Sequence, residues 1–189
     1  MTNNEIKRDE LHFRRIDMRG WGRANGLYEV EGRVTDRKPH VFITADGIKR
    51  VPANEPNHDM GVRLVFDEHM LVREVSAFMD AAPFEDCYTA TETLQALKDL
   101  RLFGGWAKEV RHRLGGVKSC THLMEILTPM ASAAFQSLTM ARRQRPEALA
   151  ADGRPSKVNS CYAYAADRGV VMRRWPDYYT ATKSKAPKP

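Results

Sequence analysis

Alternating apolar and polar residues predict β-strands in the first half of the chain. Within 27–35, apolar side chains alternate with charged ones, so we expect one buried and one solvated face. A short apolar run at 41–44 is expected to pair with this strand across the connection at 36–39. Segments 60–66 and 71–78 carry a similar signal and are joined by a connection of hairpin length. The pattern predicts an antiparallel meander of three or four strands.

Helical periodicity replaces this alternation in the second half. Segment 91–100 has apolar residues at helical spacing, and a stripe with the spacing i, i+4, i+8 follows between two glycine pairs. That stripe consists of Trp106, Val110 and Leu114. A long helix with an apolar stripe is predicted over 121–141, with Pro129 inside it. Strands followed by helices that pack on one face of the sheet define the α+β class.

The length of 189 residues suits one domain with a sizeable core. We expect a flexible N-terminus over 1–13, a single α+β domain over 14–175 and a basic flexible tail over 176–189. Segment 145–157 is rich in proline, alanine and charge, which is typical of an exposed linker. Apolar residues at 42% and charged residues at 29% are ordinary values for a globular protein.

Charge and targeting signals narrow the class of protein. The formal net charge is +6, but no aromatic-basic motif or finger spacing accompanies it, so we expect no nucleic-acid partner. The first residues are polar and no apolar run has the length of a membrane span, which predicts a cytoplasmic protein without membrane contact. The sparse cysteines Cys87, Cys120 and Cys161 predict reduced thiols. A homodimer is expected because oligomers of such proteins commonly pair symmetrically.

A cysteine and a histidine stand at the predicted start of the long helix. Gly115 and Gly116 precede Cys120 and His122, and the helix follows directly. The free N–H groups and the positive dipole end of a helix stabilise anions, so they would lower the pKa of Cys120 in the first turn. The alternative is that Cys120 is a buried thiol and His122 a residue that caps the helix.

A second histidine candidate is His58, which follows a loop rich in proline and asparagine at the start of a strand. We expect its imidazole at a strand end facing a cleft, where it can move protons near neutral pH. The neighbouring Asp59 could set its tautomer or raise its pKa. Adjacent residues on a strand point to opposite faces, so Asp59 could instead bond the backbone.

Three kinds of chemistry remain open for these residues. A metal-free acid-base site would use His58 and His122 with the hydroxyl of Tyr88 or Tyr162. A zinc or iron site would use thiolate and imidazole ligands. Its ligands would be Cys87, Cys120 and His122, with His58 as a further candidate. Nucleophilic catalysis by Cys120, oriented by His122, is the third. Trp106 is either core or part of a pocket that binds substrate.

The motifs together resemble a known family. They are His58-Asp-Met60 ahead of a strand hairpin, Pro83 four residues before Cys87, and Cys120-Thr-His-Leu123 opening a helix. This combination resembles the bacterial family called domain of unknown function 2889, over most of residues 14–175. The sequence departs from the family pattern at Ser119, where glycine is usual, and at Tyr162, where histidine is common. The resemblance implies an association with bacterial breakdown of aromatic or steroid-like compounds.

The order of elements is also similar to that of NifU/IscU-like iron-sulfur scaffold proteins. That resemblance implies that Cys87, Cys120 and His122 map onto ligand positions, although the first Gly-Cys motif of these scaffolds is absent. Three functions are therefore expected as alternatives. The first is a small-molecule enzyme with lyase-type acid-base chemistry on an aromatic or hydrophobic compound. The others are a metal-handling scaffold and a non-catalytic interaction module.

Overall fold

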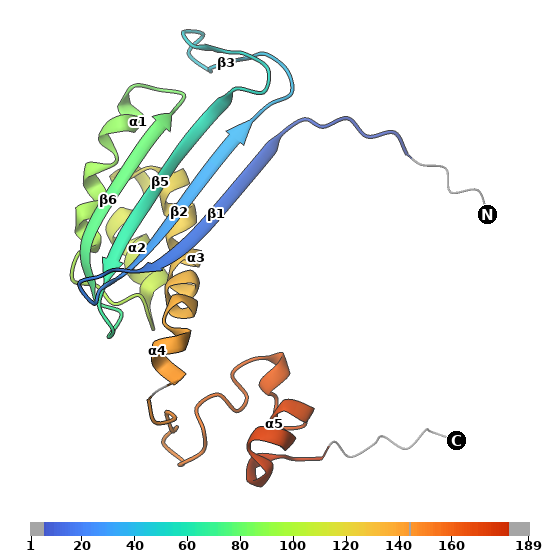
Figure 1. The fold of residues 1–189 in the computed structure, drawn as a ribbon. Helices are drawn as coiled ribbons and strands as arrows, with labels where there is room; N and C mark the ends of the chain where they lie inside the picture. The colour runs from blue at the N-terminus through green and yellow to red at the C-terminus, as the bar shows by residue number, and fades with distance from the viewer. Residues whose placement is uncertain (1–5, 144, 182–189) are drawn as a thin grey trace. The chain divides into compact units, whose positions relative to one another are not determined.

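Four long antiparallel strands form the sheet of the first part of the chain (Figure 1). The computed structural model describes residues 6–143 and 145–181. The strands are β1 (Phe13–Gly22), β2 (Tyr28–Arg37), β5 (Pro56–Phe66) and β6 (Val72–Ala81). They lie in the order β1-β2-β5-β6, and each neighbouring pair is antiparallel. The predicted meander is confirmed, with four strands.

Two features of the sheet differ from the sequence prediction. No strand is predicted over β1, because most of its residues are exposed and leave little apolar alternation to detect. The short apolar run at 41–44 was expected to pair with β2, and this is wrong. Its strand β3 (Phe42–Ile43) pairs with β4 (Arg50–Val51) in a separate hairpin. The reason is that β1 and β5 already occupy both edges of β2.

The two faces of the sheet have different chemistry, as the alternation in β2 predicts. Val30 and Val34 are fully buried among the helices. The intervening Arg33 binds the carboxylate of Asp59 on the neighbouring strand β5 and contacts that of Asp80 on β6, one strand further. The helices cover one face of the sheet (Figure 1). The other face carries charged pairs of this kind.

The helices of this part are mostly short, and the longest of them packs against the buried face of the sheet. They are α1 (Asp86–Thr89), α2 (Trp106–Leu114), α3 (Thr121–Ser137) and α4 (Thr139–Arg143), with 3-10 turns at Glu92–Leu97 and Gly116–Lys118. The predicted helix over 91–100 is thus a 3-10 helix, and the one over 121–141 ends four residues early before α4 begins. Gly32 lets α3 approach β2, because a Cβ there would lie 3.0 Å from two atoms of Met130.

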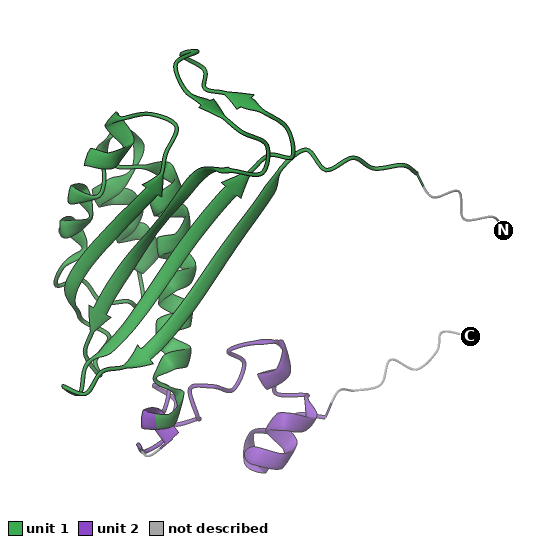
Figure 2. Ribbon diagram, turned by 45° about the horizontal axis from the view of Figure 1, so that its top comes forward, with its two compact units in different colours: residues 1–140 green, residues 141–189 purple. Residues whose placement is uncertain are grey.

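The chain divides into two compact units, residues 1–140 and 141–189 (Figure 2). The prediction of one domain over 14–175 does not match this division. The second unit contains α5 (Gly169–Arg174) and 3-10 turns at Tyr162–Tyr164 and Pro176–Tyr178. It has its own small core, formed by Val158, Val171 and Trp175.

The predicted boundaries of the termini also shift. Residues 176–180 were expected in the tail, but Thr180 donates its backbone N–H to Ala166 and thus belongs to the folded second unit. The predictions for 1–5 and 182–189 lie outside the described residues. Among the described helices, none combines the length and the apolar character that crossing a membrane requires.

Candidate active site

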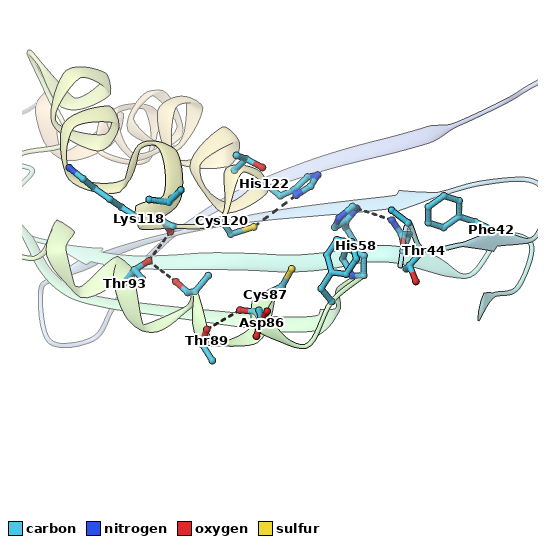
Figure 3. Close-up of a pocket in the computed structure, with 18 residues that line it drawn as sticks. Phe42, Thr44, His58, Asp86, Cys87, Thr89, Thr93, Lys118, Cys120 and His122 are labelled. Atoms are coloured by element: carbon cyan, nitrogen blue, oxygen red, sulfur yellow. Dashed lines mark hydrogen bonds between the residues drawn. The ribbon is translucent and has the colours of Figure 1, made fainter. Parts of the chain in front are cut away.

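A pocket of about 730 Å³ opens at one end of the sheet, where β5 begins and α3 starts (Figure 3). Four of its lining residues are the candidates His58, Cys87, Cys120 and His122. These side chains come from β5, from α1 and from the start of α3. The fold therefore brings together residues that are up to 64 positions apart in the sequence, from 58 to 122.

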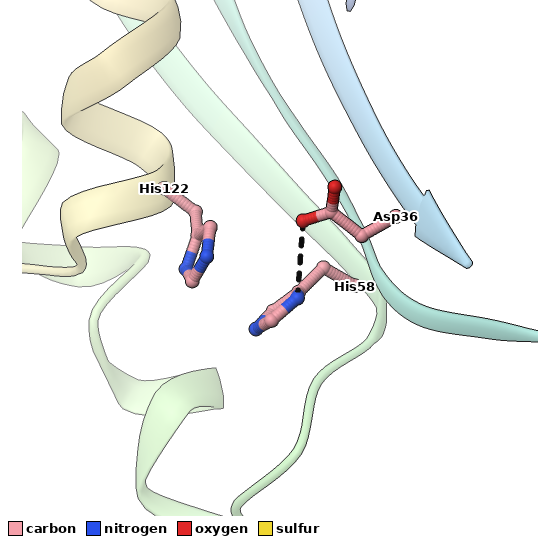
Figure 4. A group of neighbouring side chains, drawn as sticks. All are labelled: Asp36, His58 and His122. Carbon is pink, nitrogen blue, oxygen red and sulfur yellow. Dashed lines mark ion pairs between the residues drawn. The ribbon is translucent and has the colours of Figure 1, made fainter. Parts of the chain in front are cut away.

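Strand pairing gives His58 a carboxylate partner from another strand. Asp36, near the end of β2, lies directly opposite His58 of β5 in the register of the sheet. Its Oδ2 is 3.2 Å from Nδ1 of His58 (Figure 4). Asp59 does not fill this role, because alternation turns it to the other face, where it binds Arg33 at 2.6 and 2.7 Å. The prediction of a His58–Asp59 pair is therefore corrected to His58–Asp36.

Asp36 is buried, with 2% of its surface exposed, and is held on both oxygens. Arg14 of β1 donates from Nε to Oδ1 and from a terminal nitrogen to Oδ2, both at 2.7 Å. Nε2 of His12 lies 3.1 Å from Oδ1. Burial would raise the pKa of Asp36, but the hydrogen bonds and charge of Arg14, with smaller effects of His58 and His12, hold it below its ordinary value. Asp36 is therefore a carboxylate at neutral pH.

His58 is neutral at neutral pH. Burial and the nearby His122 together lower its pKa to about 4, although Asp36 opposes both effects. A carboxylate only accepts hydrogen bonds, so the proton of the neutral ring sits on Nδ1 and faces Asp36. This leaves the lone pair of Nε2 free.

His122 lies against His58 in the pocket. The centroids of the two rings are 3.8 Å apart and the ring planes are tilted by 32°. Figure 4 shows the rings facing each other from α3 and β5. Nδ1 of His122 is 3.9 Å from Sγ of Cys120, so each imidazole has a different partner.

Cys120 is the N-cap residue of α3, one position before the first helical turn. Burial would raise the pKa of its thiol, but the hydrogen bond with His122 and the backbone N–H groups of Leu123 and His122 outweigh it, so the pKa is lowered. The helix start thus acts on Cys120 as the sequence predicts, with His122 as an additional cause. The pKa of Cys87 is raised, mainly by burial.

Two of the predicted substrate-binding residues, Tyr88 and Trp106, do not line this pocket. Tyr88 is partly exposed on α1 and is not among the described residues that line the pocket. Trp106 is buried, donates from Nε1 to the carbonyl of Leu127 at 2.7 Å, and borders a separate hollow beside Phe103. Tyr162 is exposed in the second unit. Tyr88 and Trp106 are therefore not supported as substrate-binding residues of this pocket, and the role of Tyr162 stays a prediction.

One group within the described part of the chain offers three candidate ligand atoms for a metal ion. It consists of Asp36, His58 and His122, whose ligand atoms all lie within 4.8 Å of one another. Cys87 and Cys120 line the same pocket but are outside this group. The sequence analysis did not identify Asp36 and Arg14 as site residues. They are identified by the strand register rather than by a local motif.

Fold and site define an α+β domain with a pocket of histidines and thiols. The chain matches the model of the family described as protein of unknown function (DUF2889) over residues 12–136, and it belongs to this family. The match covers every residue that lines the pocket and confirms the resemblance read from the motifs. No curated protein and no solved structure matches the chain. The likeness to NifU/IscU-like scaffolds therefore stays a prediction without further support.

Proposed function

We propose that this protein is a small-molecule enzyme that carries out lyase-type acid-base chemistry on an aromatic or other hydrophobic compound. The observation that carries the proposal is the contact between the His58 and His122 rings in one pocket, with Asp36 bound to His58. Proton removal and return need two groups within reach of one substrate. The setting that the family resemblance suggests is bacterial aromatic catabolism.

Asp36 gives His58 a fixed orientation. Its carboxylate binds Nδ1 and is itself fixed by Arg14, so Nε2 of His58 is held away from the carboxylate. Such an arrangement holds the reactive nitrogen in place before a substrate binds. The second imidazole, His122, then stands beside the first to exchange a proton with the leaving group.

The lining of the pocket favours an apolar substrate with few polar groups. Phe42, Phe84 and Val117 line it and have partly or fully exposed side chains, which a bound aromatic compound would cover. Polar groups of the lining include Asp86 and Lys118, and the hydroxyls of Thr93 and Ser119 bond each other at 2.7 Å. Mostly apolar walls with a few polar groups are typical of small-molecule sites.

The test measures the exchange of a carbon-bound proton of the substrate with solvent. We would incubate the protein in D₂O with 4-hydroxyphenyl compounds that carry an acidic C–H on the first side-chain carbon and a hydroxyl on the next. Elimination breaks the C–H bond and the C–O bond, forms C=C and releases water. NMR is expected to show deuterium entering the first carbon or the alkene appearing. His58→Gln and His122→Gln should each slow this about 10²- to 10⁴-fold.

The matched control is His69→Gln, at an exposed histidine in the β5–β6 turn, which should leave the rate unchanged. Two results contradict the proposal: a wild-type protein that neither exchanges nor eliminates any compound of the set, and histidine variants that are as fast as wild type. We further expect a homodimer in the cytoplasm, and light scattering on the purified protein measures its mass in solution.

A further inference from the structure

We infer that Cys120 and His122 form a nucleophilic pair, whose thiolate adds to the carbon–carbon double bond of an aromatic α,β-unsaturated carbonyl compound in the pocket. This addition is a second reaction of the pocket and is measured without a lyase substrate. Only the aromatic class of the electrophile rests on the proposed function. Because the attacking atom is a sulfur, both imidazole rings stay available for proton transfer.

The thiol of Cys120 has a base beside it. Its Sγ lies 3.9 Å from Nδ1 of His122, at the long end of hydrogen bonds that involve sulfur (Figure 3). The sulfur of Met60 lies at the same distance, but a thioether is a weak acceptor. A cysteine is activated as a nucleophile when an adjacent base takes its proton. The proton therefore moves to Nδ1 of His122, and a thiolate remains.

The start of α3 stabilises the charge of this thiolate. Cys120 is the N-cap residue of a helix of 17 residues, where free N–H groups and the helix dipole favour an anion. Burial would raise the pKa of the thiol, but His122 and the backbone N–H groups of Leu123 and His122 lower it. Burial raises the pKa of Cys87, the other thiol that lines the pocket. Cys120 is therefore the reactive thiol of the two.

The walls around Cys120 indicate the class of electrophile. Phe42 is half-buried, Phe84 is 41% exposed and Val117 is fully exposed, and all three line the pocket together with Cys120. They offer apolar surface to an aromatic ring. Sulfur is soft and polarizable, so a thiolate favours the electrophilic carbon of a conjugated double bond. An aromatic compound with a C=C bond conjugated to a carbonyl combines both properties.

The addition conserves atoms and electrons. Sγ of Cys120 donates an electron pair to the β-carbon and forms the S–C bond, while the π electrons of the double bond move to the carbonyl as an enolate. His122, which holds the thiol proton on Nδ1, gives the proton of Nε2 to the α-carbon. The enolate returns to a carbonyl and His122 is neutral again. The net change is the addition of S–H across the double bond, which needs no oxidant or further reactant.

The experiment measures alkylation of the reduced, full-length protein by benzylideneacetone at pH 7. Peptide mass spectrometry is expected to find one adduct per chain, on Cys120, formed about 10-fold faster than on free N-acetylcysteine. Cys120→Ser should form no such adduct. The aliphatic analogue, in which methyl replaces phenyl, gives the preference for an aromatic ring once each rate is divided by that with N-acetylcysteine. Phe84→Ala should reduce this preference.

A pH profile tests the role of His122. The ultraviolet absorbance of the thiolate should be present at pH 7 in the wild type and only at higher pH in His122→Gln. This variant should also react about 10²-fold more slowly. The other titratable groups that line the pocket are unchanged in it, so the shift reports on His122. These groups are His58, Asp86, Cys87 and Lys118.

Controls separate this pair from other cysteines and histidines. Cys161→Ser, in the second unit, and His69→Gln should leave the alkylation rate of Cys120 unchanged. Circular dichroism verifies that each variant is folded. The inference is overturned if Cys120 reacts no faster than N-acetylcysteine, or if folded His122→Gln reacts at the wild-type rate. Equal normalised rates with the two enones would overturn the aromatic class.

The D₂O exchange assay on the wild-type protein distinguishes the two proposals. Rapid alkylation of Cys120 without exchange of any compound would keep the nucleophile and contradict the lyase. Exchange without rapid alkylation would overturn the nucleophile and leave the proposed function standing. Both reactions in one protein would support both proposals.

Discussion

Gly61 occupies a position in β5 where a side chain has no space. A Cβ there would meet the ring of Phe78 on β6 and lie 2.6 Å from the carbonyl oxygen of Gly32. The ring can move aside but the backbone of β2 cannot. We expect Gly61→Ala to lower the free energy of unfolding by about 1 to 3 kcal/mol, measured by urea denaturation.

Gly22, at the end of β1, is the matched control for that prediction, because a Cβ there has no neighbour within 4 Å. Gly22→Ala should leave the free energy of unfolding unchanged or raise it slightly, since alanine loses less backbone entropy on folding. Equal losses in the two variants would show that close contact with β2 is not the cause.

Trp106 contributes to stability rather than to the pocket. Its Nε1 donates a buried hydrogen bond to the carbonyl of Leu127, and Trp106→Phe leaves that carbonyl without this donor. We expect a loss of about 1 to 2 kcal/mol in the free energy of unfolding, measured by urea denaturation, with an unchanged rate of exchange in D₂O. Slower exchange in folded Trp106→Phe would show that the indole acts on the pocket.

The sequence reveals the pocket histidines and thiols but not what orients them. His58, Cys120 and His122 were predicted because each stands at the expected start of an element. Asp36 was not, because it meets His58 only through the register between β2 and β5. Asp59 took its place in the prediction as the nearest carboxylate in sequence, although strand alternation turns it to the opposite face.

The β5–β6 hairpin depends on one carboxylate. Asp67 accepts backbone N–H groups of His69 and Leu71 at 2.8 and 3.0 Å and binds the guanidinium of Arg73 at 2.7 Å. Burial would raise the pKa of Asp67, but these partners hold it below its ordinary value of 3.8. Because the folded-state pKa is lowered, the charged form stabilises the protein above that value, and the contribution is lost as the pH falls through the folded-state pKa.

Asp67→Asn should therefore lower the free energy of unfolding by about 1 to 2 kcal/mol at pH 7. The difference in this free energy from wild type should shrink as the pH falls below about 4. Urea unfolding at a series of pH values measures both. Glu92→Gln, at an exposed carboxylate outside the hairpin, should show no such change with pH. A difference for Asp67→Asn that stays constant down to pH 3 would exclude its charge as the cause.

The strands that are buried on one face were predicted from the sequence. The edge strand β1 and the pairing of β3 were not. β2, β5 and β6 show apolar alternation because one face of each packs against helices. β1 lies at the edge of the sheet and is mostly exposed, so its sequence carries little of that signal. The partner of β3 depends on which strand edges are free, which no local pattern encodes.

The first unit has a core cluster and a pocket of its own. The core cluster runs from Val30 to Leu138, and the pocket lining from Phe42 to His122. We expect a chain that ends after residue 143 to fold cooperatively and to keep the D₂O exchange rate of the full-length protein. Thermal unfolding and the exchange assay measure this. Loss of cooperative unfolding in the truncated chain would show that the second unit is needed for stability.

The fold class of the whole molecule could be predicted from the sequence, but its division into two compact units could not. Strand and helix periods predict the α+β class, which the sheet and helices confirm. The division after residue 140 depends on which residues contact each other in the folded chain. The small core around Trp175 has too few apolar residues to predict a separate unit from the sequence. Segment 145–157 did carry the signal of a linker at the start of the second unit.

The site has a thermodynamic consequence because its parts come from β2, β5 and α3. They meet only when the sheet has paired and α3 has docked on it, so an occupant of the pocket binds the native state alone. Such an occupant raises the free energy of unfolding by about 2.7 kcal/mol at one hundred times its dissociation constant. The melting temperature of this protein is therefore a detector for the occupant, and it can rank metals and aromatic compounds before any turnover is known.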